Sequence, residues 1–167
     1  MKKKYYPIDE CLKLCKEYNI LDAQAYLLKR IGDLNEALEM DIKILSESYQ
    51  KLINEREKDY LTMNKKEYTK YFKQAMKVCE KHASTSKSSE ESEHLLWFVL
   101  LDELYIQWLK IQGLLNEKRE RAVVTSKISM LSISSTLISQ SIRDLLKQMS
   151  QTVSLPVILK VLHSLFS

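Results

Sequence analysis

Glycine and proline, which make tight turns easy to form, are nearly absent from this chain. Two of each occur among its 167 residues, of which 45% are hydrophobic. Strands joined by short turns need glycine, proline or asparagine at defined positions, so this composition disfavours a β-sheet fold. The length is sufficient to bury a core and is typical of one domain. We therefore expect a single all-α unit over residues 1–167.

The segment Ala25–Leu38 predicts two helices joined by a tight turn. Gly32 is suited to the left-handed conformation that ends a helix, and Asp33 or Asn35 to capping the next one. Small alanines around the turn let the two helix axes approach closely, as the stacked hairpins of an α-solenoid require. Apolar contacts at helical spacing are expected from Leu27, Leu28 and Ile31. The residues expected to form this structural turn are Tyr26, Leu27, Leu28, Gly32, Asp33 and Ala37.

Apolar periodicity along the chain predicts about seven helices. The first follows Pro7 and ends at Asn19, and the second covers Leu21–Ile31. After Gly32 a long third helix is expected to continue to Tyr60. The remaining helices are expected over Asn64–Ala83, Leu95–Gly113, Asn116–Met149 and Val157–Phe166, with Asn64 as an N-cap and Pro156 at the last helix start.

A polar stretch at residues 84–92 separates two of these helices and is expected to be a flexible loop. Ser88 or Ser89 is placed to cap the helix that follows. Because Ser88 precedes Glu91 by three residues, it also resembles a substrate of acidophilic kinases, with a plain linker as the alternative. The next helix opens with apolar residues around its whole circumference, which predicts cover on several sides. Its expected core anchors are Trp97, Phe98 and Trp108.

The sequence contains no motif typical of a metal centre or an active site. Cys11, Cys15 and Cys79 are expected to be reduced thiols packed as small apolar groups, because their spacing differs from that of zinc knuckles. Gly32 and Gly113 are too few for a glycine-rich phosphate loop, and no serine, cysteine or threonine lies in a nucleophile motif. We therefore expect no metal, no cofactor and no enzymatic activity.

A row of lysines on the fourth expected helix is the clearest candidate binding face. The row consists of Lys66, Lys70, Lys73, Lys77 and Lys81. Their steps of three and four residues place them on one side of a helix. Such a row binds an acidic partner or an anionic membrane, or is a solvated face that keeps the helix soluble. The net charge of +4 is modest and comes mostly from lysine, which disfavours nucleic acid as a partner.

The apolar stretches are too short to cross a membrane. The longest, Leu95–Leu101, falls far below the ~20 residues that a transmembrane helix needs. Acidic residues rather than an apolar core follow the basic N-terminus, so we expect no secretory signal and a cytoplasmic location. The last expected helix has an apolar face that predicts a neighbouring repeat beyond this chain. This face consists of Leu159, Leu162, Leu165 and Phe166.

Three blocks of sequence, in order along the chain, resemble one protein family. They are YPIDECLKLCKEYNILDAQAYLLKRIGDLNEAL at Tyr6–Leu38, LLWFVLLDEL at Leu95–Leu104 and LPVIL at Leu155–Leu159. Together they resemble the C-terminal half of the vacuolar protein sorting-associated protein 8 family, which are subunits of the CORVET tethering complex. Downstream of LPVIL the resemblance implies further glycine-containing repeats, whereas this sequence stops at Ser167.

The resemblance implies an α-solenoid segment of stacked antiparallel helical hairpins, similar to those of clathrin-heavy-chain and TPR-like proteins. It also implies a non-enzymatic scaffold in a complex that tethers early endosomes before fusion, peripheral on endosomal membranes. The implied partners are other tethering-complex subunits and, indirectly, an early-endosomal Rab GTPase. The sequence contains neither the family's β-propeller nor its RING cysteines. Two alternatives stay open: an unrelated TPR-like or clathrin-repeat adaptor, and a peripheral membrane-binding helical bundle.

Overall fold

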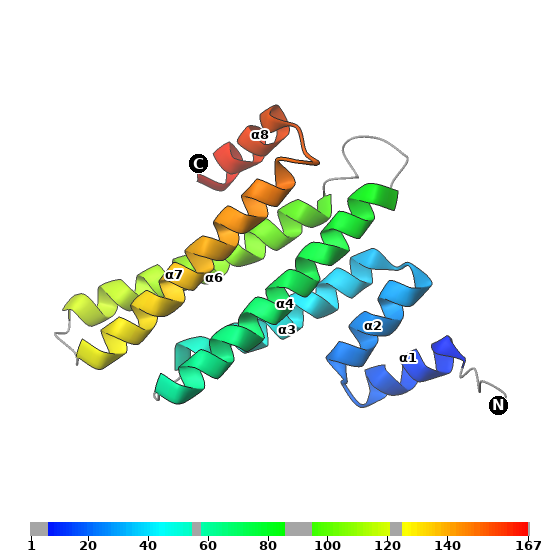
Figure 1. Ribbon diagram of the computed structural model, residues 1–167, viewed down its shortest axis with the longest axis horizontal. Helices are drawn as coiled ribbons and strands as arrows, with labels where there is room; N and C mark the ends of the chain where they lie inside the picture. Colours follow the sequence, from blue (N-terminus) through cyan, green and yellow to red (C-terminus); the bar gives the residue numbers. More distant parts are fainter. Residues whose placement is uncertain (1–6, 55–57, 86–94, 121–124, 167) are drawn as a thin grey trace.

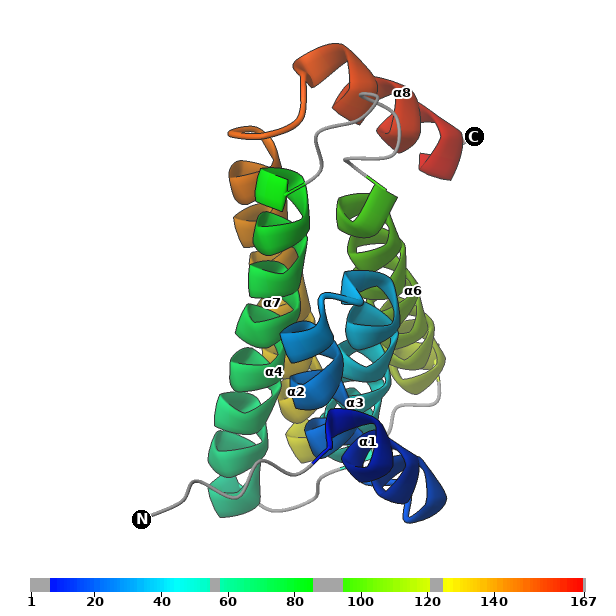
Figure 2. The same cartoon turned by 90° about the vertical axis from the view of Figure 1, so that its right-hand side faces the viewer.

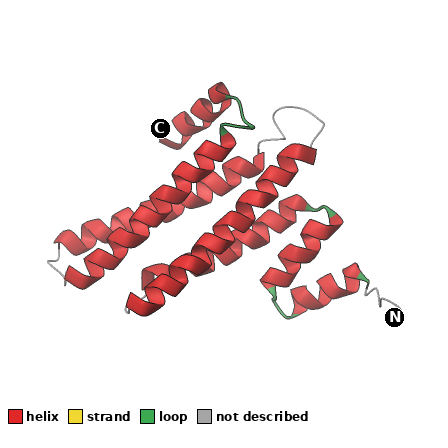
Figure 3. Ribbon diagram, in the orientation of Figure 1, coloured by secondary structure: helices red, strands yellow, loops and turns green. Residues whose placement is uncertain are grey.

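The computed structural model describes residues 7–54, 58–85, 95–120 and 125–166, which are helical apart from short turns (Figure 3). No strand occurs in these ranges, which confirms the predicted all-α class. The helices are α1 Ile8–Glu17, α2 Leu21–Ile31, α3 Leu34–Asn54, α4 Lys58–Thr85, α6 Leu95–Glu120, α7 Thr125–Met149 and α8 Leu155–Phe166 (Figure 1).

Two long antiparallel hairpins form the centre of the fold. Helices α3 and α4 make the first and α6 and α7 the second, and each of these four helices contacts the other three. The short hairpin of α1 and α2 packs on α3 through α2, and α8 crosses one end of the second long hairpin (Figure 2). The structure is therefore a stack of antiparallel helical hairpins, as predicted, and its two long hairpins pack against each other as a four-helix bundle.

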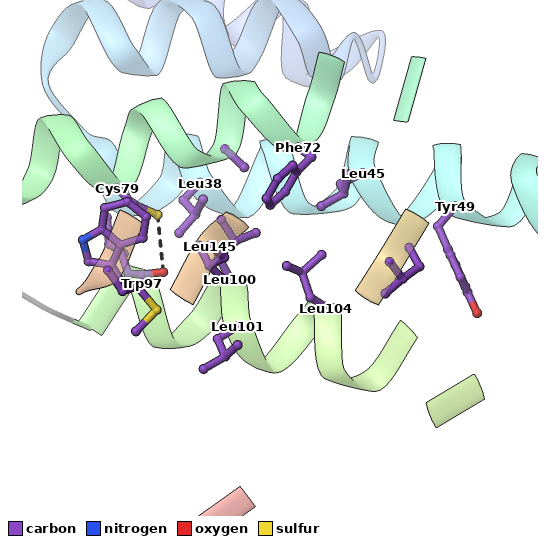
Figure 4. Packing of buried hydrophobic residues seen from close by; sticks show 14 of the residues in the cluster. Leu38, Leu45, Tyr49, Phe72, Cys79, Trp97, Leu100, Leu101, Leu104 and Leu145 are labelled. Carbon is purple, nitrogen blue, oxygen red and sulfur yellow. Dashed lines mark hydrogen bonds between the residues drawn. The ribbon is translucent and has the colours of Figure 1, made fainter. Parts of the chain in front are cut away.

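The main core lies between the two long hairpins. Figure 4 shows side chains of α3, α4, α6 and α7 meeting there, among them Leu38, Phe72, Leu100 and Leu145. The expected anchor Trp97 is fully buried, whereas Phe98 and Trp108 are partly buried and pack against the same cluster. A smaller cluster joins α2 to α3 and consists of Ala25, Leu28, Ala37 and Met40.

The turn between α2 and α3 has the geometry that its sequence predicts. Gly32 adopts a left-handed φ of 90°, and the amides of Gly32 and Asp33 each donate to the Leu28 carbonyl at 3.1 Å. The Asp33 carboxylate accepts a hydrogen bond from the Glu36 amide at 3.0 Å and so caps α3. Glycine therefore ends one helix and the next residue starts the other.

The side chains around this turn differ in burial. Leu28 and Ala37 are buried and Leu27 is half-buried, but Tyr26 is 60% exposed. The prediction of an apolar contact for Ile31 is wrong, because this residue is 47% exposed. Ile31 is the last residue of α2 and lies outside the cluster that packs α2 on α3. The contact between these helices therefore rests on small and medium side chains.

The boundary between α3 and α4 differs from the prediction. The described part of α3 ends at Asn54 and α4 begins at Lys58, so Tyr60 belongs to α4 rather than to α3. Asn64, the predicted N-cap, is 7% exposed and lies one turn before Tyr68 on the inward face of α4. The local pattern around Asn64 predicts a helix start because it contains no information about burial of this residue inside a longer helix.

Helix α6 is longer than predicted for a similar reason. It continues past Gly113 and Asn116 to Glu120. A Cβ at Gly113 would meet no atom within 4 Å, so no close packing requires glycine there. Glycine inside a helix costs about 1 kcal/mol relative to alanine. Burial of Ile111 and Leu115 on either side offsets that cost.

Some predictions fall partly outside the described residues. The loop expected at 84–92 is wrong for residues 84 and 85, which belong to α4. Ser88 and Ser89 lie outside the described residues. The side chains of Leu165 and Phe166 lie outside them as well. The predicted burial of all three cysteines is correct only for Cys79, because the other two, on the thinly covered helix α1, are half-buried.

Candidate interaction surfaces

The outward face of α6 is an exposed apolar stripe. Helices α3, α4 and α7 contact α6, so it is covered on several sides as expected, but no described residue covers this face. The exposed fractions are 58% for Leu95, 40% for Val99, 37% for Ile106 and 46% for Leu109. We define the α6 stripe as Leu95, Val99, Asp102, Ile106, Leu109 and Gly113, which are all exposed and spaced at three or four residues.

An apolar groove of about 350 Å³ lies beside the α6 stripe, between α6, α7 and α8. Leu101, Tyr105 and Trp108 of α6 line it, and Tyr105 and Trp108 stack with their ring centroids 6.1 Å apart. Tyr105 is three residues after Asp102 and four before Leu109, so it connects the groove to the stripe. The remaining lining residues are Ser139, Ile142, Arg143, Leu146 and Leu162.

The outward face of α4 is basic. Lys66, Lys70, Lys73 and Lys77, four of the five lysines predicted to share a face, line one shallow groove of about 670 Å³ together with Lys65. The fifth, Lys81, is used differently, because its Nζ donates to the backbone carbonyl of Lys29 on α2 at 3.0 Å. We define the lysine face as Lys65, Lys66, Lys70, Lys73 and Lys77, all of which are exposed.

The charge of the lysine face is not neutralised by described residues. Within Thr62–Lys77 the only acidic residue is Glu67, and Glu67 pairs with Lys51 of α3 at 3.1 Å. That hydrogen bond and the Glu67 charge raise the pKa of Lys51. No described carboxylate forms an ion pair with the lysine face. Lys70 places its Nζ 5.0 Å from the centre of the Tyr71 ring.

A buried polar network connects the two long hairpins. Gln107 of α6 accepts a hydrogen bond from Tyr49 at its backbone carbonyl, at 3.0 Å, and one from Tyr68 at Oε1, at 2.9 Å. Its Nε2 donates to Glu103 at 2.8 Å. Burial, followed by the Glu103 charge, raises the pKa of Tyr49 to about 12. Burial also raises the pKa of Tyr68, so both phenols are held neutral, and their hydrogen bonds to Gln107 join α3 and α4 to α6.

A buried ion pair joins α2 to α3. Asp41 is 1% exposed, and its carboxylate lies 2.7 Å from the Lys29 ammonium. Burial raises the pKa of Asp41, against the lowering effect of Lys29. Sequence analysis missed this pair, although Asp41 occupies an inward position of α3, three residues after Leu38 and four before Leu45. A charge at an inward position is the signal that identifies such a pair.

Cys11, Cys15 and Cys79 do not belong to a metal-binding cluster of described residues. The described residues hold no group of three or more His, Cys, Asp or Glu side chains able to bind a metal ion. Cys79 is buried against the Leu96 carbonyl, at 3.5 Å, and burial raises the pKa of its thiol (Figure 4). A thiol with a raised pKa is a weak nucleophile and a weak metal ligand.

Within the described ranges no helix is long and apolar enough to span a bilayer. Comparison of the whole chain with family models, curated proteins and solved structures found no match. The chemistry of the α6 stripe and the lysine face therefore carries the functional interpretation.

Proposed function

We propose that this chain is a non-enzymatic scaffold segment, and that the α6 stripe is the surface on which a helix of another protein docks. The observation that carries this proposal is the uncovered row of Leu95, Val99, Ile106 and Leu109. Contiguous apolar surface exposed to water is unfavourable in an isolated protein and marks interaction sites. The proposed work is to hold partner proteins at a fixed spacing.

The shape of the α6 stripe favours an amphipathic helix as its partner. From Leu95 to Gly113 the stripe follows one side of a straight element for about 27 Å, the length of five helical turns. Within this molecule the same spacing packs helix on helix between the hairpins. Because Gly113 has no side chain, the backbone of a partner helix can approach α6 closely at this end of the stripe. Asp102, at the middle of the stripe, favours a lysine or arginine on that partner.

The resemblance to the vacuolar protein sorting-associated protein 8 family suggests which proteins dock. Its second block, Leu95–Leu104, forms the first half of the α6 stripe, and its first block forms α1, α2 and the start of α3. In this proposal the partner helix belongs to another subunit of a CORVET-like tether, peripheral on endosomal membranes. Engagement of an early-endosomal Rab GTPase is indirect, through those subunits.

A second candidate is an unrelated TPR-like or clathrin-repeat adaptor that binds peptides. The groove lined by Leu101, Tyr105 and Trp108 favours it, since aromatic-lined apolar grooves accept short peptide segments. The two candidates differ in the surface used, which is a 27 Å stripe in one and a pocket of about 350 Å³ in the other. They also differ in partner, since only the first requires subunits of a tether.

Co-purification of the tagged full chain with individually identified CORVET core subunits tests the first candidate. The variant Val99→Glu/Ile106→Glu places two charges on the stripe and should lose these subunits. The matched control Ile133→Glu/Leu159→Glu places two charges on apolar side chains of α7 and α8 that are 42% and 55% exposed and lie outside the stripe, and should retain them.

Two results would contradict this proposal. Retention of the subunits by a folded stripe variant excludes docking on the α6 stripe. Failure of the wild-type chain to bring down any CORVET subunit excludes that complex, and loss of another identified partner by Trp108→Ala would then favour the peptide adaptor.

A further inference from the structure

We propose that the lysine face of α4 binds the surface of a membrane that contains anionic lipids. This proposal is independent of docking at the α6 stripe. Five lysines, Lys65, Lys66, Lys70, Lys73 and Lys77, project from the outward side of a single helix over about 18 Å. Because α4 alone lines this surface, it is open along its length and can meet an extended surface rather than enclose a small molecule.

The side chains on this face favour lipid headgroups over nucleic acid. All five cations are lysines, which act as flexible point charges and suit a diffuse anionic surface. Arginine, whose planar fork reads phosphates and base edges in pairs, is absent from Thr62–Lys77. No exposed aromatic residue lies within this stretch, since Tyr68 and Phe72 are buried and Tyr71 is half-buried, so bases have no exposed ring on which to stack.

An apolar side chain accompanies the lysines on the same side of α4. Met63 is 56% exposed and precedes Lys66 by three residues and Lys70 by seven, so it lies beside them. Helices that bind in the membrane interface combine lysines with apolar side chains that enter the boundary between headgroups and acyl chains. The lysine stems add apolar length while their ammonium groups stay in water.

The position of α4 is compatible with contact to a membrane on one side and to proteins on the other. Figure 2 shows α4 and α6 at opposite edges of the four-helix bundle. The lysine face and the α6 stripe are the outward faces of these two helices. A membrane bound at the lysine face therefore leaves the α6 stripe accessible.

Vesicle sedimentation with the full chain tests this proposal. The vesicles contain phosphatidylcholine alone or phosphatidylcholine with phosphatidylserine. The face variant is Lys66→Gln/Lys70→Gln/Lys73→Gln/Lys77→Gln. The control variant is Lys13→Gln/Lys43→Gln/Lys110→Gln/Lys147→Gln, which changes four exposed lysines on other helices. Each variant lowers the net charge from +4 by 4, to 0, so only the position of the charge differs.

We expect the wild type and the control variant to sediment with phosphatidylserine vesicles at low salt and to be released at high salt. Loss of one lysine near a membrane weakens binding about fivefold, so the face variant should bind at least tenfold more weakly than the control. Met63→Ser, made in a chain that keeps all its lysines, should also bind these vesicles more weakly than the wild type does. Circular dichroism should be unchanged in all variants, because none of the substituted side chains is buried.

Three results would overturn the proposal. Equal binding by the face and control variants would show that vesicle binding depends on net charge and not on the lysine face. Equal binding of the wild type to both kinds of vesicle would exclude recognition of anionic lipid. Binding to polyglutamate or to single-stranded RNA, with no binding to either vesicle, would assign the lysine face to a soluble acidic polymer instead.

Discussion

Helices α4 and α6 pack into the same core, but their outward faces have opposite chemistry. Inward, α4 contributes Tyr68 and Phe72 and α6 contributes Trp97 and Leu104, all buried. Outward, α4 presents lysines, whereas α6 presents leucine, valine and isoleucine. The inward faces are alike in that both bury apolar side chains, whose packing depends mainly on size and spacing. The outward faces differ because nothing in the fold constrains them.

This difference separates what stabilises the molecule from what it binds. A lysine-rich outer face keeps a helix soluble at no cost to its packing. An apolar outer face stabilises nothing in the isolated chain and exposes it to unwanted association. The α6 stripe is therefore the stronger indication of a protein partner, and the lysine face needs the vesicle experiment to distinguish a binding surface from a solvated one.

The largest expected effect is on the inward face of α6. Trp97→Ala should lower the free energy of unfolding by about 3–5 kcal/mol, because it empties the site of a fully buried large side chain. Trp97→Phe should cost less, since the indole Nε1 has no hydrogen-bond acceptor among the described residues. Urea unfolding followed by circular dichroism measures both. Equal loss in the two variants would show that a phenyl ring recovers none of the packing of the indole, and would contradict this expectation.

The next effect concerns the inward face of α4. Tyr68→Phe removes the donor to Gln107 Oε1 and leaves that buried oxygen without this partner, so we expect a loss of about 1–3 kcal/mol. Tyr60→Phe is the matched control on the same helix, because Tyr60 is 53% exposed and its change should be within about 0.5 kcal/mol. Comparable losses in both variants would show that the hydrogen bond from Tyr68 to Gln107 does not stabilise the contact between the two long hairpins.

A smaller effect, dependent on pH, is expected at the contact of α2 with α3. Burial raises the pKa of Asp41 above its ordinary value of 3.8, so folding favours the protonated acid. The contribution of this carboxyl group to stability is therefore complete below pH 3.8 and is lost as pH rises through its folded pKa. The free energy of unfolding of the wild type, minus that of Asp41→Asn, should decrease as pH rises from 3.8. An increase over that range would mean that Lys29 outweighs burial.

Much of the fold follows from local sequence. Gly32 and Asp33 predict the turn between α2 and α3 because left-handed geometry and capping depend on a few adjacent residues. The boundaries near Asn64 and Gly113 were not predictable in this way. Whether a polar or flexible residue ends a helix depends on burial by other helices, and that burial is a property of the assembled hairpins.

The candidate surfaces show the same division. Helical spacing correctly groups Lys66, Lys70, Lys73 and Lys77. It does not predict that the Lys81 Nζ donates to the carbonyl of Lys29, which belongs to α2, 52 residues earlier in the chain. The apolar start of α6 is evident in the sequence, but the side left uncovered depends on where α3, α4 and α7 pack. Local pattern thus identifies faces, and tertiary packing decides which of them remain exposed.

The smallest expected effects on stability lie on the two outward faces. They test whether the outward faces of α4 and α6 contribute little to stability while the inward faces form the core. Val99→Ser on the α6 stripe and Lys73→Gln on the lysine face should each change the free energy of unfolding by no more than about 0.5 kcal/mol, because both side chains are exposed. Urea unfolding measures this, with Leu104→Ala on the inward face of α6 as the destabilised reference at a loss of about 2–5 kcal/mol. A loss above 1.5 kcal/mol for Val99→Ser would mean that the stripe is part of the core, covered by residues outside those described, and would contradict its assignment as a docking surface.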